Sequence, residues 1–296
     1  MPRKQVAEMR RVRNGLFGLA CLLQLLPLAW AGNPEPVLVP LAGLSSAPQP
    51  LQAMLFRPQQ PGGKRPAVVM VHGCGGAYAK SGALGARHQA WGELLAEAGY
   101  VVLMLDSFTA RGIREICTVK FGDRTIKESD RVGDAYAALQ YMRQLDVVDP
   151  QRVALLGWSH GGGLVLDALS RKPPPEPGYR AAVSFYPGCT ARNRKASEFQ
   201  PYAPLLLLIG EADDWTPAAP CITLAASVAG RGGPMQIVIY PGAYHDFDNP
   251  GKQPPRRRMD VPNGVSPGSG VMVGPNPAAR SDAQRRVRDF LQENLR

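Results

Sequence analysis

The sequence predicts an α/β fold, with a mostly parallel central sheet covered by helices on both faces. The first observation is that short apolar runs alternate along the chain with longer segments of helical periodicity. The second is that some runs, such as residues 66–71 and 204–209, are almost entirely apolar, which is typical of parallel strands buried on both faces. With 296 residues, 45% of them hydrophobic, the chain can build one large core.

The elements follow in order along the chain. Apolar runs bounded by turn-forming or charged residues are the expected strands: residues 51–57, 66–71, 100–105, 152–156, 180–186, 204–209 and 235–240. Apolar residues spaced by three and four indicate the expected helices: residues 89–98, 125–145, 161–172, 218–229 and 279–295. Residues 33–50 are typical of a linker or an edge segment, and the Pro- and Gly-rich residues 249–278 of a long surface loop. We expect a single domain over residues 32–296.

Residues 1–31 have the pattern of a secretory signal peptide. A basic start is followed by an apolar run from Leu16, and Ala29 and Ala31 are small residues at the positions that signal peptidase reads. The run is short for a spanning helix, which needs about 20 apolar residues. We therefore expect cleavage after Ala31, a periplasmic or secreted protein, and no stable membrane span. An uncleaved anchor is the alternative; a lipoprotein through Cys21 is disfavoured because the apolar run continues past it.

Charge and composition exclude several classes of function. The net charge is +10, with basic clusters at the N-terminus and at residues 256–258. Nucleic-acid binding would need basic residues interleaved with aromatic ones on one face, and this pattern is absent, so we expect no nucleic-acid partner. The metal motif His-Glu-x-x-His and paired Cys-x-x-Cys are also absent, so we expect neither a metal nor a cofactor. The oligomeric state is not indicated.

Four cysteines remain after removal of the signal: Cys74, Cys117, Cys189 and Cys221. They allow three complete pairings, among which the sequence does not choose. An oxidising compartment permits disulfides, and a bridge that includes Cys117 is plausible in an otherwise irregular loop. Some of the four could instead be small buried apolar residues. Cys74 lies in a loop that we assign below to the active site, and we do not expect it to be bridged.

A candidate nucleophile lies in the pentapeptide Gly157-Trp158-Ser159-His160-Gly161. This pattern follows an expected strand and opens an expected helix, which is the setting of a nucleophile elbow. In such an elbow the serine occupies a sharp turn, and the flanking glycines let the strand and the helix approach closely. The alternative is an ordinary strand-to-helix turn with a surface serine.

A serine nucleophile needs a base, and only His245 of the four histidines lies well beyond Ser159 in the chain. His245 follows the expected strand 235–240 after a short turn, where ligand sites of α/β sheets occur. The acid is expected between them, at the end of strand 204–209, which is followed by Glu211, Asp213 and Asp214. Asp213 is our choice to orient His245, with Asp214 as the alternative. His245 could otherwise be a solvated loop residue.

The tetrahedral intermediate also needs hydrogen-bond donors for its oxyanion. One is expected to be the backbone N–H of His160, directly after the nucleophile. The other is expected in the loop His72-Gly73-Cys74-Gly75-Gly76, where the backbone N–H of Cys74 is our candidate. A dinucleotide loop is excluded, because Gly-x-Gly-x-x-Gly would need a glycine where the chain has Tyr78.

With these parts located, the sequence resembles the dienelactone hydrolase family of α/β-hydrolases. The matching segments are residues 71–76, 106–112, 157–161, 210–217 and 240–247. The resemblance implies an α/β-hydrolase fold over roughly residues 65–295. In this family the aspartate three residues after the strand-end glycine is the triad acid, which favours Asp213 over Asp214.

The chain departs from the name-giving enzymes of that family in two places. Those enzymes have a cysteine nucleophile, where this chain has Ser159, and a glutamate in the oxyanion loop, where this chain has Gly73. The sequence is more similar to an exported, serine-containing branch, so dienelactone itself is not the expected substrate. Arg111 is a candidate contact for a substrate carboxylate, or else it only fixes its own loop.

The sequence therefore predicts a serine hydrolase that cleaves a small carboxylic ester or lactone through an acyl-enzyme, with Ser159, His245 and Asp213 as a catalytic triad. The alternative from another class is an exported, non-catalytic binding protein on a hydrolase fold. A peptidase or a lipase of the same fold is the remaining alternative, although no extended apolar lid or added propeller domain is present.

Overall fold

The computed structural model describes residues 33–60, 62–170 and 177–296. Its centre is an eight-stranded sheet with the order β1-β2-β4-β3-β5-β6-β7-β8. The strands are β1 (Glu35–Val39), β2 (Leu51–Phe56), β3 (Arg65–Val71), β4 (Val101–Leu105), β5 (Val148–Trp158), β6 (Ala181–Phe185), β7 (Leu205–Gly210) and β8 (Met235–Tyr240). The pairs β1–β2 and β2–β4 are antiparallel, and every other neighbouring pair is parallel. The predicted fold class is confirmed.

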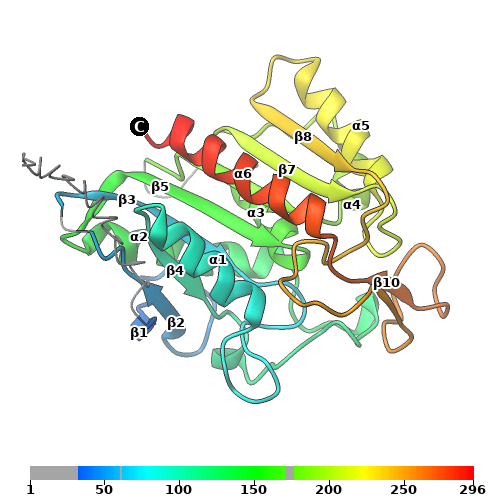
Figure 1. Cartoon of the computed structure of the whole chain (residues 1–296), viewed down its shortest axis with the longest axis horizontal. Helices are drawn as coiled ribbons and strands as arrows, with labels where there is room; N and C mark the ends of the chain where they lie inside the picture. The colour runs from blue at the N-terminus through cyan, green and yellow to red at the C-terminus, as the bar shows by residue number, and fades with distance from the viewer. Residues whose placement is uncertain (1–32, 61, 171–176) are drawn as a thin grey trace, which may run out of the picture.

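Helices cover both faces of this sheet. In Figure 1, α1 (Ala86–Glu97) and α6 (Pro277–Asn294) cross the near face, and α2 (Val132–Gln144) and α3 (His160–Leu169) pack behind it. The helix α5 (Ala218–Ala229) packs along β8 and contacts the one-turn helix α4 (Thr190–Asn193). The carboxyl ends of the parallel strands all reach the same edge, where the loops gather. This edge is where the sequence places the site.

Residues 33–50, expected as a linker or an edge segment, contain the edge strand β1. One helix begins later than expected. The helix expected from residue 125 begins at Val132, after two single turns, η2 (Phe121–Asp123) and η3 (Ser129–Arg131). The Asp130 side chain accepts a hydrogen bond from the Lys127 backbone N–H (2.8 Å), which closes a turn in place of the first helical turn.

The segment expected as one long loop contains a two-stranded antiparallel sheet of β9 (Arg256–Arg258) and β10 (Val271–Val273). It lies at the carboxyl edge of the main sheet (Figure 1), and Val273 forms a bridge to His245. The next residues begin α6: the Asn276 side chain caps this helix by accepting from the Ala279 N–H (3.1 Å), and Pro277 follows at the first helical position. The sheet β9–β10 thus forms part of the surroundings of His245.

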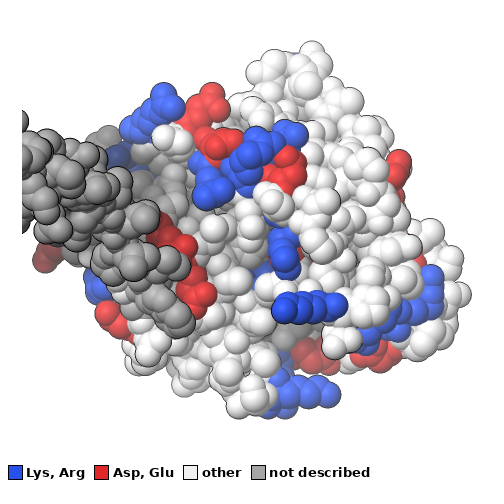
Figure 2. Space-filling model, viewed as in Figure 1, with Lys and Arg blue, Asp and Glu red and all other residues white. Residues whose placement is uncertain are grey.

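The near face of the molecule carries interspersed charges of both signs. Figure 2 shows basic and acidic side chains side by side over α6, where Arg285 and Arg286 both pair with Asp282. Within the described ranges, no helix is long and apolar enough to cross a bilayer. The predicted signal segment, residues 1–31, lies outside those ranges.

One buried carboxylate joins four elements of the fold. Asp248, in the loop after β8, is 1% exposed. Its Oδ2 accepts hydrogen bonds from the indole nitrogens of Trp91 in α1 (2.9 Å) and Trp158 at the end of β5 (2.8 Å). Its Oδ1 accepts one from the hydroxyl of Tyr186, directly after β6 (2.5 Å), and lies 3.4 Å from Arg87 Nε. A buried polar group without a hydrogen-bond partner lowers the free energy of unfolding. The positions of α1, β5, β6 and the loop after β8 therefore depend on one another at Asp248.

We expect Asp248→Ala to lower the free energy of unfolding by about 3–5 kcal/mol, because three buried donors lose their acceptor. Asp248→Asn should cost less, since one acceptor oxygen remains. Chemical denaturation followed by tryptophan fluorescence measures both values. The control is Asp260→Ala, which removes a largely exposed aspartate and should change stability by less than about 1 kcal/mol. Equal losses in Asp248→Ala and Asp260→Ala would show that the buried carboxylate does not join these elements.

Candidate active site

Ser159 occupies a strained turn between β5 and α3. Its backbone has φ 53° and ψ −115°, an unusual conformation for a residue with a side chain. The turn is held by hydrogen bonds from Ser159 N–H to Phe185 O (2.9 Å) and from Gly163 N–H to Ser159 O (2.8 Å). Gly157 is required here, because a Cβ at this residue would lie 2.3 Å from Gly161 O. The predicted nucleophile therefore has the backbone of a nucleophile elbow.

His245 and Asp213 meet at the same edge of the sheet. Asp213 follows β7, His245 follows β8, and Asp213 Oδ2 lies 2.7 Å from His245 Nδ1. The other oxygen, Oδ1, accepts hydrogen bonds from the backbone N–H groups of Trp215 (2.9 Å) and Thr216 (2.8 Å). A carboxylate held in this way keeps the proton of a neutral imidazole on Nδ1 and leaves Nε2 free to accept another.

The alternative acid, Asp214, lies in different surroundings. Its Oδ1 accepts from the backbone N–H of Met272 (2.7 Å), and its Oδ2 pairs with Arg257 (3.3 Å). Asp214 therefore links β7 to the β9–β10 sheet, and the structure brings only Asp213 to His245.

Aromatic rings enclose His245, which is 2% exposed. The ring centroids of Tyr186 and Trp215 lie 4.4 and 4.7 Å from that of His245. Tyr186 also donates to Asp248, so the ring that packs on His245 is fixed by the buried carboxylate described above. These contacts limit the orientations that the imidazole can adopt.

Two cavities meet at Ser159. The smaller, of about 240 Å³, is lined by the glycine-rich loop, Ser159 and His245. The larger, of about 590 Å³, extends from Ser159 and His160 between residues 121–128 and α4. Cys74 and Trp215 line both cavities. The serine thus lies where a substrate could place a different substituent on each side of the reacting bond.

The glycine-rich loop is covalently fixed. Cys74 forms a disulfide with Cys117, and Cys74 O accepts a hydrogen bond from Ile116 N–H (2.8 Å). The expected bridge to Cys117 is therefore present, but the expectation that Cys74 is unbridged is wrong. The reason is that the irregular segment after β4 packs directly on the glycine-rich loop, a contact that the spacing of the cysteines does not reveal. The second disulfide joins Cys189, before α4, to Cys221 in α5.

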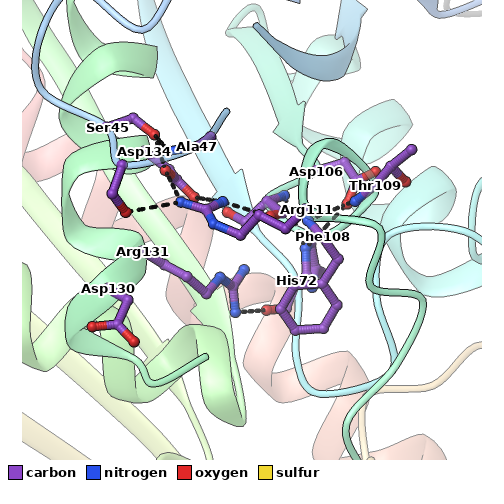
Figure 3. A network of polar contacts seen from close by, with 12 residues as sticks. Ser45, Ala47, His72, Asp106, Phe108, Thr109, Arg111, Asp130, Arg131 and Asp134 are labelled. Atoms are coloured by element: carbon purple, nitrogen blue, oxygen red, sulfur yellow. Dashed lines mark hydrogen bonds and ion pairs between the residues drawn. The ribbon is translucent and has the colours of Figure 1, made fainter. Parts of the chain in front are cut away.

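Arg111 lies away from both cavities. Its guanidinium pairs with the buried carboxylate of Asp134 (2.8 and 2.9 Å) and donates to Ser107 O (2.6 Å), as Figure 3 shows for Asp134. Asp134 also accepts from the hydroxyl of Ser45. The suggestion of a substrate contact is thus wrong, and the alternative holds: Arg111 fixes its own loop against α2.

The predicted oxyanion donors belong to two residues that line the larger cavity together with Ser159. His160 is the first residue of α3, so its backbone N–H has no partner within the helix. No described group accepts a hydrogen bond from the backbone N–H of Cys74. Two amides without a described backbone acceptor therefore belong to residues at the cavity that contains Ser159.

Sequence reasoning missed two buried groups beside the site, Asp248 and Arg131. Arg131 ends η3, is fully buried and donates to His72 O (3.0 Å) behind the glycine-rich loop (Figure 3). Neither residue is part of a recognisable motif. Both lie among other charged and polar residues, in segments 127–134 and 245–249, so nothing in the sequence distinguishes them from surface residues.

Comparison with known proteins shows which family and which fold the chain has. The curated protein dipeptidyl peptidase 8 of Mus musculus is 27% identical over 233 residues, which are 68% of this chain and 25% of the peptidase. The chain thus spans about a quarter of the length of this relative. Two solved structures share the α/β-hydrolase fold, although their sequence identity is low.

The first solved structure is a Klebsiella pneumoniae protein assigned as a dienelactone hydrolase (TM-score 0.66, 17% identity, covering 88% of this chain and 98% of that one). The second is Thermogutta terrifontis esterase 2 phosphorylated by paraoxon (TM-score 0.62, 22% identity, covering 89% and 95%). The family model described as "Dienelactone hydrolase family" matches residues 51–295, most of the chain. The family predicted from the ordered motifs is therefore confirmed, and the protein belongs to the dienelactone hydrolase family.

Proposed function

We propose that this protein is a serine hydrolase that cleaves a small carboxylic ester or lactone through an acyl-enzyme, with Ser159, His245 and Asp213 as its catalytic triad. The observation that carries the proposal is the 2.7 Å contact between Asp213 and His245, at the same cavity as a serine in the strained elbow conformation. The proposal is supported by the family of the chain and by an esterase neighbour that paraoxon phosphorylates.

In the first half of the reaction, Ser159 Oγ attacks the ester carbonyl carbon while His245 Nε2 takes the hydroxyl proton. Asp213 stabilises the imidazolium that forms. The carbonyl oxygen becomes an oxyanion, which the backbone N–H groups of Cys74 and His160 bind. The intermediate then collapses: the bond to the leaving oxygen breaks, this oxygen receives the proton from His245, and the acyl group stays on Ser159.

In the second half, water attacks the acyl carbonyl and His245 takes a proton from it. Collapse of the second tetrahedral intermediate returns the proton to Ser159 Oγ and releases the acid. With a lactone, the alcohol and the acid are parts of one molecule, which leaves only after this step. The peptidase alternative uses the same steps with an amine as leaving group, and the similarity to dipeptidyl peptidase 8 supports its inclusion in the substrate test.

We also propose that the protein functions outside the cytoplasm. The support is the signal pattern of residues 1–31 together with two disulfides in the described chain, Cys74–Cys117 and Cys189–Cys221. Structural disulfides persist in oxidising compartments and are rare in the cytosol.

The direct test uses wild type and Ser159→Ala with short p-nitrophenyl esters, the matching anilides and a fluorophosphonate probe. We expect ester turnover and probe labelling by the wild type, with a loss of about 10⁴-fold or more in kcat for Ser159→Ala. Faster turnover of anilides than of esters would favour a peptidase. A wild type that neither labels nor hydrolyses any ester would instead be a non-catalytic binding protein.

The two neighbouring aspartates provide a matched pair. We expect Asp213→Asn to lower kcat by about 10³- to 10⁴-fold, because the amide no longer holds His245 in the required tautomer. Asp214→Asn changes only a contact to the β9–β10 sheet, and its kcat should stay within about 5-fold of wild type. Steady-state kinetics on one ester decides between them, and the opposite order of effects would assign the acid role to Asp214.

The two disulfides provide a second matched pair. They join residues 43 and 32 positions apart, so removal of either should cost a similar unfolding free energy of about 4 kcal/mol. Only Cys74–Cys117 holds an oxyanion donor. We therefore expect the double variant Cys74→Ser/Cys117→Ser to lose about 10-fold or more in kcat, and Cys189→Ser/Cys221→Ser to lose much less. Activities measured well below both melting temperatures test this difference, and equal losses would contradict it.

A further inference from the structure

A buried guanidinium contacts the residue that follows Ser159. Arg131 is fully buried, and its Nη1 donates to His72 O (3.0 Å) and lies 2.8 Å from His160 Nδ1. The Phe108 ring lies 5.0 Å from its central carbon (Figure 3). Burial lowers the pKa of Arg131 to about 10, with the carboxylates of Asp134 and Asp106 opposing this change. The guanidinium is therefore protonated at neutral pH.

Arg131 fixes the tautomer of His160. A guanidinium has five N–H donors and no acceptor, so His160 Nδ1 must accept the hydrogen bond. The single proton of the neutral ring then resides on Nε2. Burial, and after it the positive charge of Arg131, lowers the pKa of His160 well below its usual value. The nearby Arg124, His72 and Arg192 act on the pKa of His160 in the same direction. His160 is thus a neutral imidazole with a permanent donor at Nε2.

The Nε2 donor of His160 has no hydrogen-bond partner among the described residues. His160 lines the larger cavity together with Ser159. Some side-chain nitrogens of the described residues are buried from solvent and have no hydrogen-bond partner; Nε2 of His88 is one of them, and Nε2 of His160 is not. The Nε2–H of His160 therefore has no hydrogen-bond partner and is not fully buried. The accessible space that His160 lines is the cavity that contains Ser159.

The charges around the cavity favour an acceptor over a cation. Arg124, Arg192 and Arg194 line it, together with the single carboxylate of Glu128. This carboxylate is already paired with Arg192 (2.9 Å). The partly exposed rim also contains the apolar side chains of Phe121 and Val265. A ligand that suits these walls is mainly apolar and carries an oxygen acceptor close to its reacting carbonyl.

We propose that the His160 side chain selects esters that carry an acceptor oxygen within a few bonds of the scissile carbonyl, by donating a hydrogen bond from Nε2. Alkoxy, keto and hydroxyl oxygens on the acyl or the alcohol part belong to this class. Arg131 is a positioning residue, which holds the imidazole in the donor tautomer. The inference rests on the proposed function, because it concerns the substrate of the same serine.

The test compares pairs of esters that differ only by an oxygen in place of a methylene. On the acyl side the pair is p-nitrophenyl methoxyacetate and p-nitrophenyl butyrate; on the alcohol side it is 2-methoxyethyl acetate and butyl acetate. Each kcat/KM is divided by the rate constant of hydroxide hydrolysis of the same ester, which removes the difference in chemical reactivity. The readout is the ratio within each pair, so a general loss of activity in a variant cancels.

We expect wild type to prefer the oxygen-containing ester of at least one pair by about 3- to 10-fold. His160→Leu should bring this ratio close to 1, and His160→Gln, which retains an N–H donor, should restore part of it. All three proteins keep the backbone N–H of residue 160. The control Phe121→Leu alters an apolar part of the same cavity wall and should keep the wild-type ratio. Equal ratios in wild type and His160→Leu for both pairs would overturn the proposal.

A second readout tests the role of Arg131 without substrate. Nitrogen-15 NMR of the imidazoles should show His160 with its proton on Nε2 from pH 5 to pH 8 in wild type. In Arg131→Met the ring should lose this fixed tautomer and take up a proton nearer its ordinary pKa. An Nδ1–H tautomer or a charged ring at pH 7 in the wild type would contradict the proposal. If wild type hydrolyses none of the four esters, the proposed function itself fails, and the inference fails with it.

Discussion

The buried carboxylate of Asp248 determines how the parts of the site meet. Its three hydrogen-bond donors come from α1, from the last residue of β5 and from the residue after β6. Each of the last two adjoins a functional group, because Trp158 precedes Ser159 and the Tyr186 ring packs on His245. Asp248 itself lies three residues after His245. One anion thus ties the segments that carry Ser159 and His245 to the same core contact, and the Tyr186 ring that packs on His245 is part of it.

The sequence was sufficient for features that depend on local pattern. Apolar runs identified the strands of the parallel sheet, and the spacing of glycines around Ser159 identified the elbow, whose φ of 53° matches the predicted strain. The position of His245 followed from chain order, since parallel strands bring their carboxyl ends to one edge. The structure places Asp213 beside His245, as the resemblance implied. All of these predictions use residues within a few positions of a strand end.

The remaining features depend on contacts between distant segments, which local pattern does not contain. The partners of Asp248 are 157, 90 and 62 residues away in sequence. The spacing of Cys74 and Cys117 gave no sign that the segment after β4 packs on the glycine-rich loop. Residues 33–50 were predicted as a linker or an edge segment, and pairing with β2 decides for an edge strand. In each case tertiary packing determined the outcome.

Two histidines line cavities that contain the same serine, and the charge of the residue that contacts each ring determines how the two rings differ. His245 contacts a carboxylate, which accepts the Nδ1 proton and leaves Nε2 as an acceptor suited to a base. His160 contacts a guanidinium, which donates to Nδ1 and leaves Nε2 as a donor suited to a ligand oxygen. The position of His245 in the chain indicated its role, whereas neither the residue type nor the position of His160 in the pentapeptide indicated its tautomer. Asp213 and Arg131 do not line the two cavities. The charge of each nevertheless determines whether Nε2 of its histidine accepts or donates a hydrogen bond.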